Sequence, residues 1–165
     1  MPGTAFATAS TGNRVIVGPA STAFGFKCWY LVCFHDAIVA VRQSLPTAAA
    51  MAYSTDKRLK VYGALAQLFM DTLTSPGRRM RQQIPARLQI VPDSQLRSRP
   101  NVVIPTSQVR FIILKSSKIA RYGTVVTPEI NLEMKTGKKL VYGIYVWDFE
   151  KVCSQMWQTY PQLCK

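Results

Sequence analysis

A strand, turn, strand and helix pattern in the last third of the chain restricts the fold more than any other feature. From Glu129 to Lys135, apolar and polar residues alternate strictly, which is typical of a strand with one buried face. A tight turn at residues 136–138 leads into a second, mostly apolar strand from Leu140 to Val146. The two strands therefore predict an antiparallel hairpin.

An amphipathic helix follows this hairpin. Asp148 is suited to cap its first turn, and Pro161 ends it. The apolar side chains between these residues recur at the spacing of one helical face: Phe149, Val152, Cys153, Met156, Trp157 and Tyr160. We expect this face to cover a core. The side chains expected to be buried are Phe149, Val152, Met156 and Trp157.

The N-terminal part of the chain predicts another hairpin. A short strand at residues 15–17 and a loop of small residues up to Gly25 precede a long strand from Phe26 to Phe34. His35 and Asp36 then form a turn, and residues 38–42 return as the partner strand.

The middle of the chain predicts an insertion at residues 47–100. Good helix formers with recurring apolar positions predict an inserted helix over residues 47–73. Four prolines and little periodicity predict an exposed loop over residues 76–100, with one short strand at residues 88–91. Strands resume at residues 102–104, at 109–114 and around 121–126.

Runs of strands with one closing helix exclude an alternating βαβ pattern. They indicate a mainly β fold with α, an α+β class, in which an antiparallel barrel is closed by the C-terminal amphipathic helix. The 165 residues are enough for one domain with a substantial core.

The order of these elements resembles a known superfamily. An aliphatic strand broken by a proline step, Val103-Ile104-Pro105-Thr106-Ser107-Gln108-Val109, precedes the alternating hairpin, and the last helix opens with Trp147-Asp148-Phe149-Glu150. With the early hairpin, this looks like a PH-like domain, of the kind that includes GRAM and bacterial PH domains. The resemblance implies a single PH-like domain over residues 14–161 that carries the helical and basic insertion at 47–100. It also implies a binding or scaffolding module and not an enzyme.

The resemblance does not place a lipid headgroup at the usual loop. Phosphoinositide-binding members carry several basic residues in and after the first hairpin loop, whereas residues 18–27 contain only Lys27.

Positive charge is concentrated in the middle of the chain. The net charge is +13, and residues 57–121 hold thirteen basic and two acidic side chains, a net charge of +11. Arginine, which offers planar bidentate donors to phosphate and carboxylate, predominates over residues 78–99. The candidate residues for binding an anionic partner are Arg78, Arg79, Arg81, Arg87, Arg97, Arg99, Lys57, Arg58 and Lys60.

Three interpretations of this charge stay open. The segment could recognise an acidic protein or an anionic membrane surface, or it could bind nucleic acid without sequence specificity. It could also be a solvated loop whose charge only maintains solubility. The helix before it, which begins near Lys57, could lie on a membrane surface, although its apolar face would equally pack on the barrel.

The sequence offers little to catalysis. His35 beside Asp36 is typical of a turn, and the carboxylates are scattered. The four cysteines and one histidine lack the spacing of a zinc site, and glycine-rich phosphate loops are missing. We therefore predict no catalytic residues, no metal, no cofactor and no small-molecule substrate.

The expected location is the cytoplasm, with peripheral attachment to a membrane as an option. Residues 1–13 lack the features of a secretory signal and predict a flexible N-terminal arm. Cys28 and Cys33 lie roughly 16 Å apart along one extended strand, too far to pair with each other. We expect all four cysteines to be reduced thiols.

Overall fold

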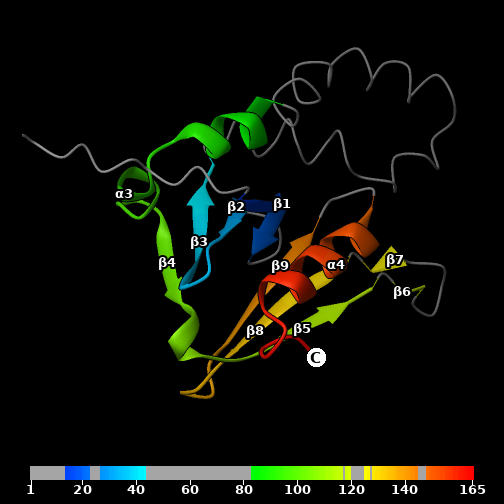
Figure 1. The fold of residues 1–165 in the computed structure, drawn as a ribbon. Helices are drawn as coiled ribbons and strands as arrows, with labels where there is room; N and C mark the ends of the chain where they lie inside the picture. Colours follow the sequence, from blue (N-terminus) through cyan, green and yellow to red (C-terminus); the bar gives the residue numbers. More distant parts are fainter. Residues whose placement is uncertain are drawn as a thin grey trace, which may run out of the picture.

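The computed structural model describes residues 14–22, 27–43, 83–116, 118–119, 125–126, 128–144 and 148–165. Seven of its strands form one antiparallel sheet: β1 (Val15–Thr22), β2 (Lys27–Cys33), β3 (Ala37–Arg42), β4 (Val102–Pro105), β5 (Val109–Lys115), β8 (Glu129–Met134) and β9 (Lys139–Ile144). Their order across the sheet is β4-β3-β2-β1-β9-β8-β5 (Figure 1). Two short strands, β6 (Lys118–Ile119) and β7 (Val125–Val126), pair separately. The α+β class is therefore confirmed, with the sheet dominant.

Helical segments flank this sheet. They are a helix at residues 83–90, α3 (Asp93–Leu96), the 3-10 turn η2 (Thr106–Gln108) and α4 (Phe149–Thr159). The Asp148 carboxylate accepts a hydrogen bond from the backbone N–H of Lys151 at 2.9 Å, so the predicted cap of the last helix is confirmed. None of the helices in the described ranges has the length and apolar character that crossing a bilayer requires.

Both predicted hairpins are present, with one difference at β1. The strand continues to Thr22 where a loop was expected from Gly18 onward, because a bulge between Val17 and Ala20 accommodates the Gly18-Pro19 step. A Cβ on Gly18 would lie 2.7 Å from the Tyr30 ring. Glycine thus allows the close packing of β1 on β2 at this point.

The main core lies between the sheet and α4. Val152 and Met156 of α4 pack with buried residues from both ends of the sheet order, Ile104 on β4 and Ile112 on β5, and with Ile130 and Leu132 on β8. Figure 1 shows α4 lying across β9 and β8. The expectation that Trp157 is buried is wrong, because its side chain is 46% exposed. Residues 152 and 156 face the sheet, and residue 157 is one step further around the helix.

The predicted barrel is not closed. β4 and β5 are the two edges of the sheet, although only η2 separates them along the chain. Pro105 at the end of β4 has no N–H to donate. On β5, the N–H and C=O of Ile112 are bonded to Leu163 and Lys165. The edge strands of the described sheet therefore do not pair with each other.

A second apolar cluster covers the other face of the β1–β4 half. Leu88 from the helix at 83–90 and Leu96 from α3 pack on Tyr30, Val32 and Val39. Residues 83–100 are therefore not an exposed loop, and no strand forms at 88–91. Pro85 lies within the described part of this helix. The apolar side chains Ile84, Leu88 and Val91 then recur at helical spacing.

Three further predictions from the sequence are met only in part or concern residues outside the described ranges. Around residues 121–126, only β7 is described as a strand, and it pairs with β6 and not with the main sheet. The predicted arm at 1–13 and the predicted helix at 47–73 lie outside the described residues.

Candidate anion-binding surface

The structure describes three of the nine predicted anion-binding residues. Arg87 lies in the helix at 83–90, Arg97 directly follows α3, and Arg99 lies two residues further on. The other six, Lys57, Arg58, Lys60, Arg78, Arg79 and Arg81, lie outside the described residues.

Arg14, which was not among the predicted residues, anchors the segment that carries these arginines. Its guanidinium donates to the carbonyls of Leu88 at 2.8 Å and Val91 at 2.6 Å, and it pairs with the Asp93 carboxylate. The amide of Gln89 bonds to both the N–H and the carbonyl of Arg14. The side chain of Arg14 is only 6% exposed, so this charge is structural and does not face a partner.

Arg97 is also engaged within the molecule. Its two terminal nitrogens donate to the two Asp36 carboxylate oxygens at 2.8 and 2.7 Å, a bidentate pair with the β2–β3 turn. The hydrogen bonds from Arg97 lower the pKa of Asp36 below its usual range. Of the described candidates, Arg97 is therefore the one whose donors are already committed.

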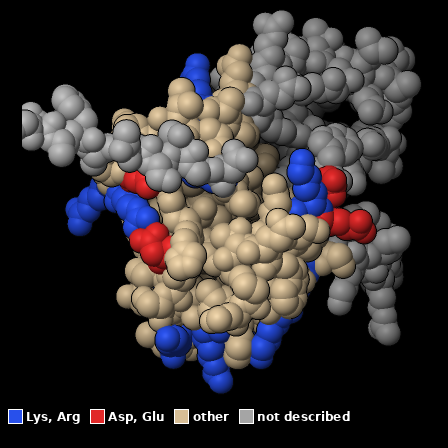
Figure 2. Space-filling model, in the orientation of Figure 1, with Lys and Arg blue, Asp and Glu red and all other residues tan. Residues whose placement is uncertain are grey.

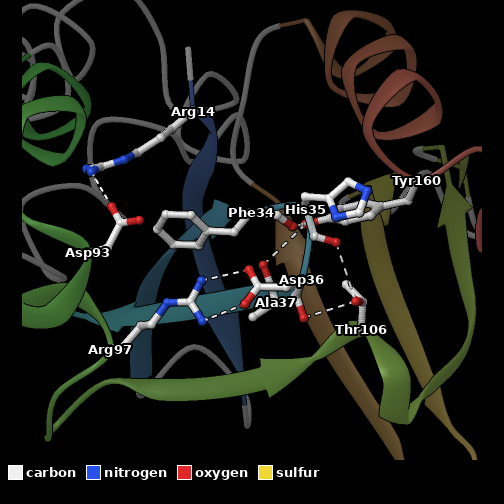
Figure 3. Close-up of polar contacts among 9 residues, drawn as sticks. All are labelled: Arg14, Phe34, His35, Asp36, Ala37, Asp93, Arg97, Thr106 and Tyr160. Atoms are coloured by element: carbon white, nitrogen blue, oxygen red, sulfur yellow. Dashed lines mark hydrogen bonds and ion pairs between the residues drawn. The ribbon is translucent and has the colours of Figure 1, made fainter. Parts of the chain in front are cut away.

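Phe34 joins these two anchors. Its ring lies between the Arg14 guanidinium, 5.6 Å from the ring centroid, and the Arg97 guanidinium at 4.8 Å (Figure 3). Next to this stack, the Asp36 carbonyl accepts hydrogen bonds from the N–H and the hydroxyl of Thr106. Arg14, Arg97 and Thr106 thus all meet at the β2–β3 turn.

Arg87 and Arg99 remain exposed, and neither makes an ion pair with any residue that the structure describes. Both lie on the segment that Arg14 and Arg97 hold against the sheet. The two roles of arginine in this segment are thus separated, since Arg97 fixes the segment and Arg87 and Arg99 are available to an anion.

A second basic surface lies at the β8–β9 turn, a region for which the sequence predicted only a turn. Lys135, Lys138 and Lys139 are all exposed there, around Gly137, which adopts a left-handed backbone with φ of 84°. Figure 2 shows blue side chains gathered at this lower end of the molecule. Three lysines within five residues of a tight turn were the signal that could have identified it.

The described residues provide no obvious catalytic group. Both carboxylate oxygens of Asp36 are taken by Arg97, so Asp36 is not free to orient His35 as a general base. Cys33, Cys153 and Cys164 are free thiols, and the side chain of Cys28 is outside the described set. Burial raises the pKa of Cys33 to about 12 and that of Cys164 to about 11, which keeps both thiols protonated.

No cluster of histidine, cysteine, aspartate or glutamate in the described part of the chain has the arrangement of a metal site. Comparisons with protein-family models, curated proteins and solved structures return no match. The interpretation of the surface therefore depends on its own geometry and charge.

Proposed function

We propose that this protein is a non-catalytic, PH-like binding module that recognises an anionic partner, an acidic protein surface or anionic membrane headgroups, through its basic insertion. The observation that carries this proposal is the state of residues 83–100. Buried contacts of Leu88 and Leu96 and the Arg14 anchor fix this segment on the sheet, while Arg87 and Arg99 stay exposed. A positively charged surface on a fixed scaffold attracts and orients anions.

The strand order supports the PH-like part of the proposal. β1 to β4 form one antiparallel meander, β5, β8 and β9 form another, and β9 joins the two by pairing with β1. α4 then covers the core face. This arrangement of a curved antiparallel sheet with one closing helix is what the resemblance implies, although the sheet stays open at its edges.

Vesicle sedimentation tests the membrane form of the proposal. Vesicles with anionic lipid are compared with neutral vesicles at low and moderate salt, using the wild type and the double variant Arg87→Glu, Arg99→Glu. Binding that needs anionic lipid, weakens with salt and falls at least tenfold in the variant supports a membrane partner. Lys151→Glu is the matched control, since it changes an exposed charge on α4, outside residues 83–100. Such a result would support peripheral attachment to a membrane.

Soluble polyglutamate tests the acidic-protein form. Fluorescence anisotropy with labelled polyglutamate, using the same variants, separates the two partners. Binding to polyglutamate without binding to vesicles supports an acidic protein. Failure of both probes at low salt would overturn the proposal.

Nucleic acid is the alternative partner, and the position of the second basic surface favours it. The helix at 83–90 and the β8–β9 turn lie at opposite ends of the molecule (Figure 1). A flat membrane contacts one of these ends at a time, whereas a polymer can follow both. With Arg97 committed to Asp36, the five other arginines of residues 78–99 and the three lysines of the β8–β9 turn predict a log-log salt slope of about −7 if all contact duplex DNA. A mobility-shift titration over salt concentration measures this slope, and a flat response would exclude the alternative.

A further inference from the structure

The outer edge of β5 is occupied by the chain's own segment 161–165. The Ile112 N–H donates to the Leu163 carbonyl at 2.8 Å, and the Lys165 N–H donates to the Ile112 carbonyl at 2.9 Å. Cys164 thereby forms an isolated parallel bridge with Ile112. The segment is thus seated as a short extra strand on a seven-residue edge, of which it uses the backbone groups of one residue.

One side chain of this segment enters the core. Cys164 is 6% exposed and packs in the main cluster, while Leu163 is half-buried against the same cluster. The segment therefore shows the two requirements of this edge, which are an extended backbone and a small apolar side chain beside Ile112.

The exposed side chains at the β5 edge are basic, and the segment that occupies this edge adds another basic side chain and no acidic one. The Lys165 ammonium lies 3.3 Å from the centroid of the Phe111 ring, and the Arg110 guanidinium lies 5.2 Å from the same centroid. Two cations thus share one aromatic ring. Residues 161–165 contain no acidic side chain that would separate them.

The remaining basic groups on β5 are weakly paired. Arg110 is 62% exposed and 3.9 Å from Glu133, and Lys115 is 52% exposed and 3.9 Å from Glu129. Such long, exposed pairs exchange readily for a better-placed carboxylate. An incoming strand with outward carboxylates would meet a cation at each end of β5.

We propose that the β5 edge is a docking site for an extended acidic strand of a partner protein, which displaces segment 161–165. This site is separate from the basic insertion, and it would bind a partner of the same acidic chemistry. The strand would alternate apolar residues, which take the place of Cys164, with acidic residues that face Arg110, Lys115 and the Phe111 side of the sheet. Backbone hydrogen bonds to β5 would supply affinity, and the charges would select the partner.

The resident segment lowers the apparent affinity for such a strand, because only molecules with the segment displaced can bind. Lys165→Pro weakens the resident segment in the full chain, since it removes both the N–H that bonds Ile112 and the ammonium over Phe111. Loss of one backbone hydrogen bond corresponds to about a fivefold change in the displacement equilibrium.

Anisotropy titration with a fluorescein-labelled peptide of alternating glutamate and valine tests the proposal, with a lysine and valine peptide as the charge control. We expect the acidic peptide to bind Lys165→Pro about fivefold more tightly than the wild type. The double variant Arg110→Glu, Lys115→Glu should lose at least tenfold in affinity, and Lys151→Glu should retain wild-type affinity. Equal affinity of the wild type and Lys165→Pro would overturn the proposal.

Amide chemical shifts of the wild type provide a test that does not depend on any variant. Titration of the acidic peptide should shift the Ile112 and Lys165 amide resonances together. If the peptide instead shifts Arg87 and Arg99 and loses affinity when those two are changed, the proposed function stands and the β5 site falls. If neither the peptide nor any polyanion binds, both proposals fall.

Discussion

The two halves of the sheet, strands β1–β4 and strands β5, β8 and β9, differ in whether one or both of their faces are covered. In β3, five consecutive residues from Ala37 to Val41 are buried, since the main core lies on one face and the insertion on the other. In β9, buried and exposed positions largely alternate, with Tyr142 buried and Val141 43% exposed. The first half is therefore a three-layer structure, and the second is a sheet with one apolar face.

The difference explains where the charged side chains go. In the three-layer half, charged groups such as Arg14 and Arg97 join the layers through specific hydrogen bonds. In the other half, Lys115 pairs with Glu129 and Lys139 pairs with Glu133, each at 3.9 Å. Mutations should accordingly have large effects where two layers meet and small ones on the outer face of β5, β8 and β9.

The largest effect is expected where α4 covers the core shared by both halves. Met156 is fully buried, so Met156→Ala should lower the free energy of unfolding by about 2–5 kcal/mol. Trp157→Ala, at the neighbouring half-exposed position, should cost about 1 kcal/mol. Urea denaturation of both variants measures the contrast. Equal losses would mean that α4 is rotated from the position described.

The second layer should depend on Leu96. This side chain is 2% exposed, and Leu96→Ala should cost about 2–4 kcal/mol in urea denaturation. Ile90, which is 79% exposed on the same segment, is the control, and Ile90→Ala should stay within about 0.5 kcal/mol of the wild type. If Leu96→Ala proved as mild as its control, the insertion would not be a stabilising layer.

Arg14 should matter for stability more than any arginine proposed to bind a partner. Arg14→Met leaves the carbonyls of Leu88 and Val91 without their donor and should cost about 2–3 kcal/mol. Arg87→Met removes an exposed charge and should change stability by less than about 0.5 kcal/mol. Thermal unfolding measures both losses of stability. A larger loss for Arg87→Met than for Arg14→Met would show that Arg14 is not the arginine that anchors this segment.

Two asparagines, one in each half, should respond in opposite directions. Asn101 accepts from the Arg42 N–H at 3.2 Å and donates to the Leu96 carbonyl at 2.8 Å, so Asn101→Val should destabilise by about 1 kcal/mol. Asn131 on β8 is 8% exposed, and its Oδ1 has no hydrogen-bond partner in the described structure. Asn131→Val should stabilise by about 1 kcal/mol, because it removes a buried unsatisfied acceptor from a strand. A destabilised Asn131→Val variant would show that the carbonyl oxygen has a partner.

The smallest effect is a pH dependence from Asp36. Because Arg97 lowers the pKa of this carboxyl in the folded state, its contribution is present above about pH 4 and is lost as the pH falls through the folded-state value. The Asp36 side chain is 63% exposed, so the contribution should be below about 1 kcal/mol. The difference in unfolding free energy between the wild type and Asp36→Asn should shrink between about pH 5 and pH 2. A constant difference over that range would mean that the Arg97 pair does not stabilise the fold.

Periodicity predicted the second half of the sheet well, because a strand with one buried face has an apolar side chain at every second residue. The alternation from Glu129 to Lys135 and the helical spacing after Asp148 gave both elements nearly to their ends. Face assignment failed at Trp157, since its spacing places it at the margin of the apolar face, where the sequence does not distinguish burial from exposure.

The insertion was harder to predict because its structure depends on contacts with residues distant in sequence. The apolar run in β3 predicted only the second strand of a hairpin, and no local pattern identifies the segment that covers its other face. Prolines at 85 and 92 suggested a loop, although Pro85 lies in the helix at 83–90 and Pro92 directly precedes α3. The charge pattern identified an arginine-rich segment, yet the commitment of Arg97 to Asp36 depends on residues 61 positions apart.

The Phe34 stack also has a consequence for the order of folding. Arg14 and Asp93 are 79 residues apart, and the aromatic ring between the two guanidiniums belongs to the β2–β3 turn. Doubling such a loop costs only about 0.6 kcal/mol in closure entropy, but contacts this distant in sequence form slowly. The segment from 83 to 97 has its docking place only after the first meander has formed. We therefore expect this segment to join the native structure late. We also expect it to detach from the sheet as a unit before the sheet itself unfolds, so that the segment carrying Arg87 has an opening equilibrium separate from global unfolding.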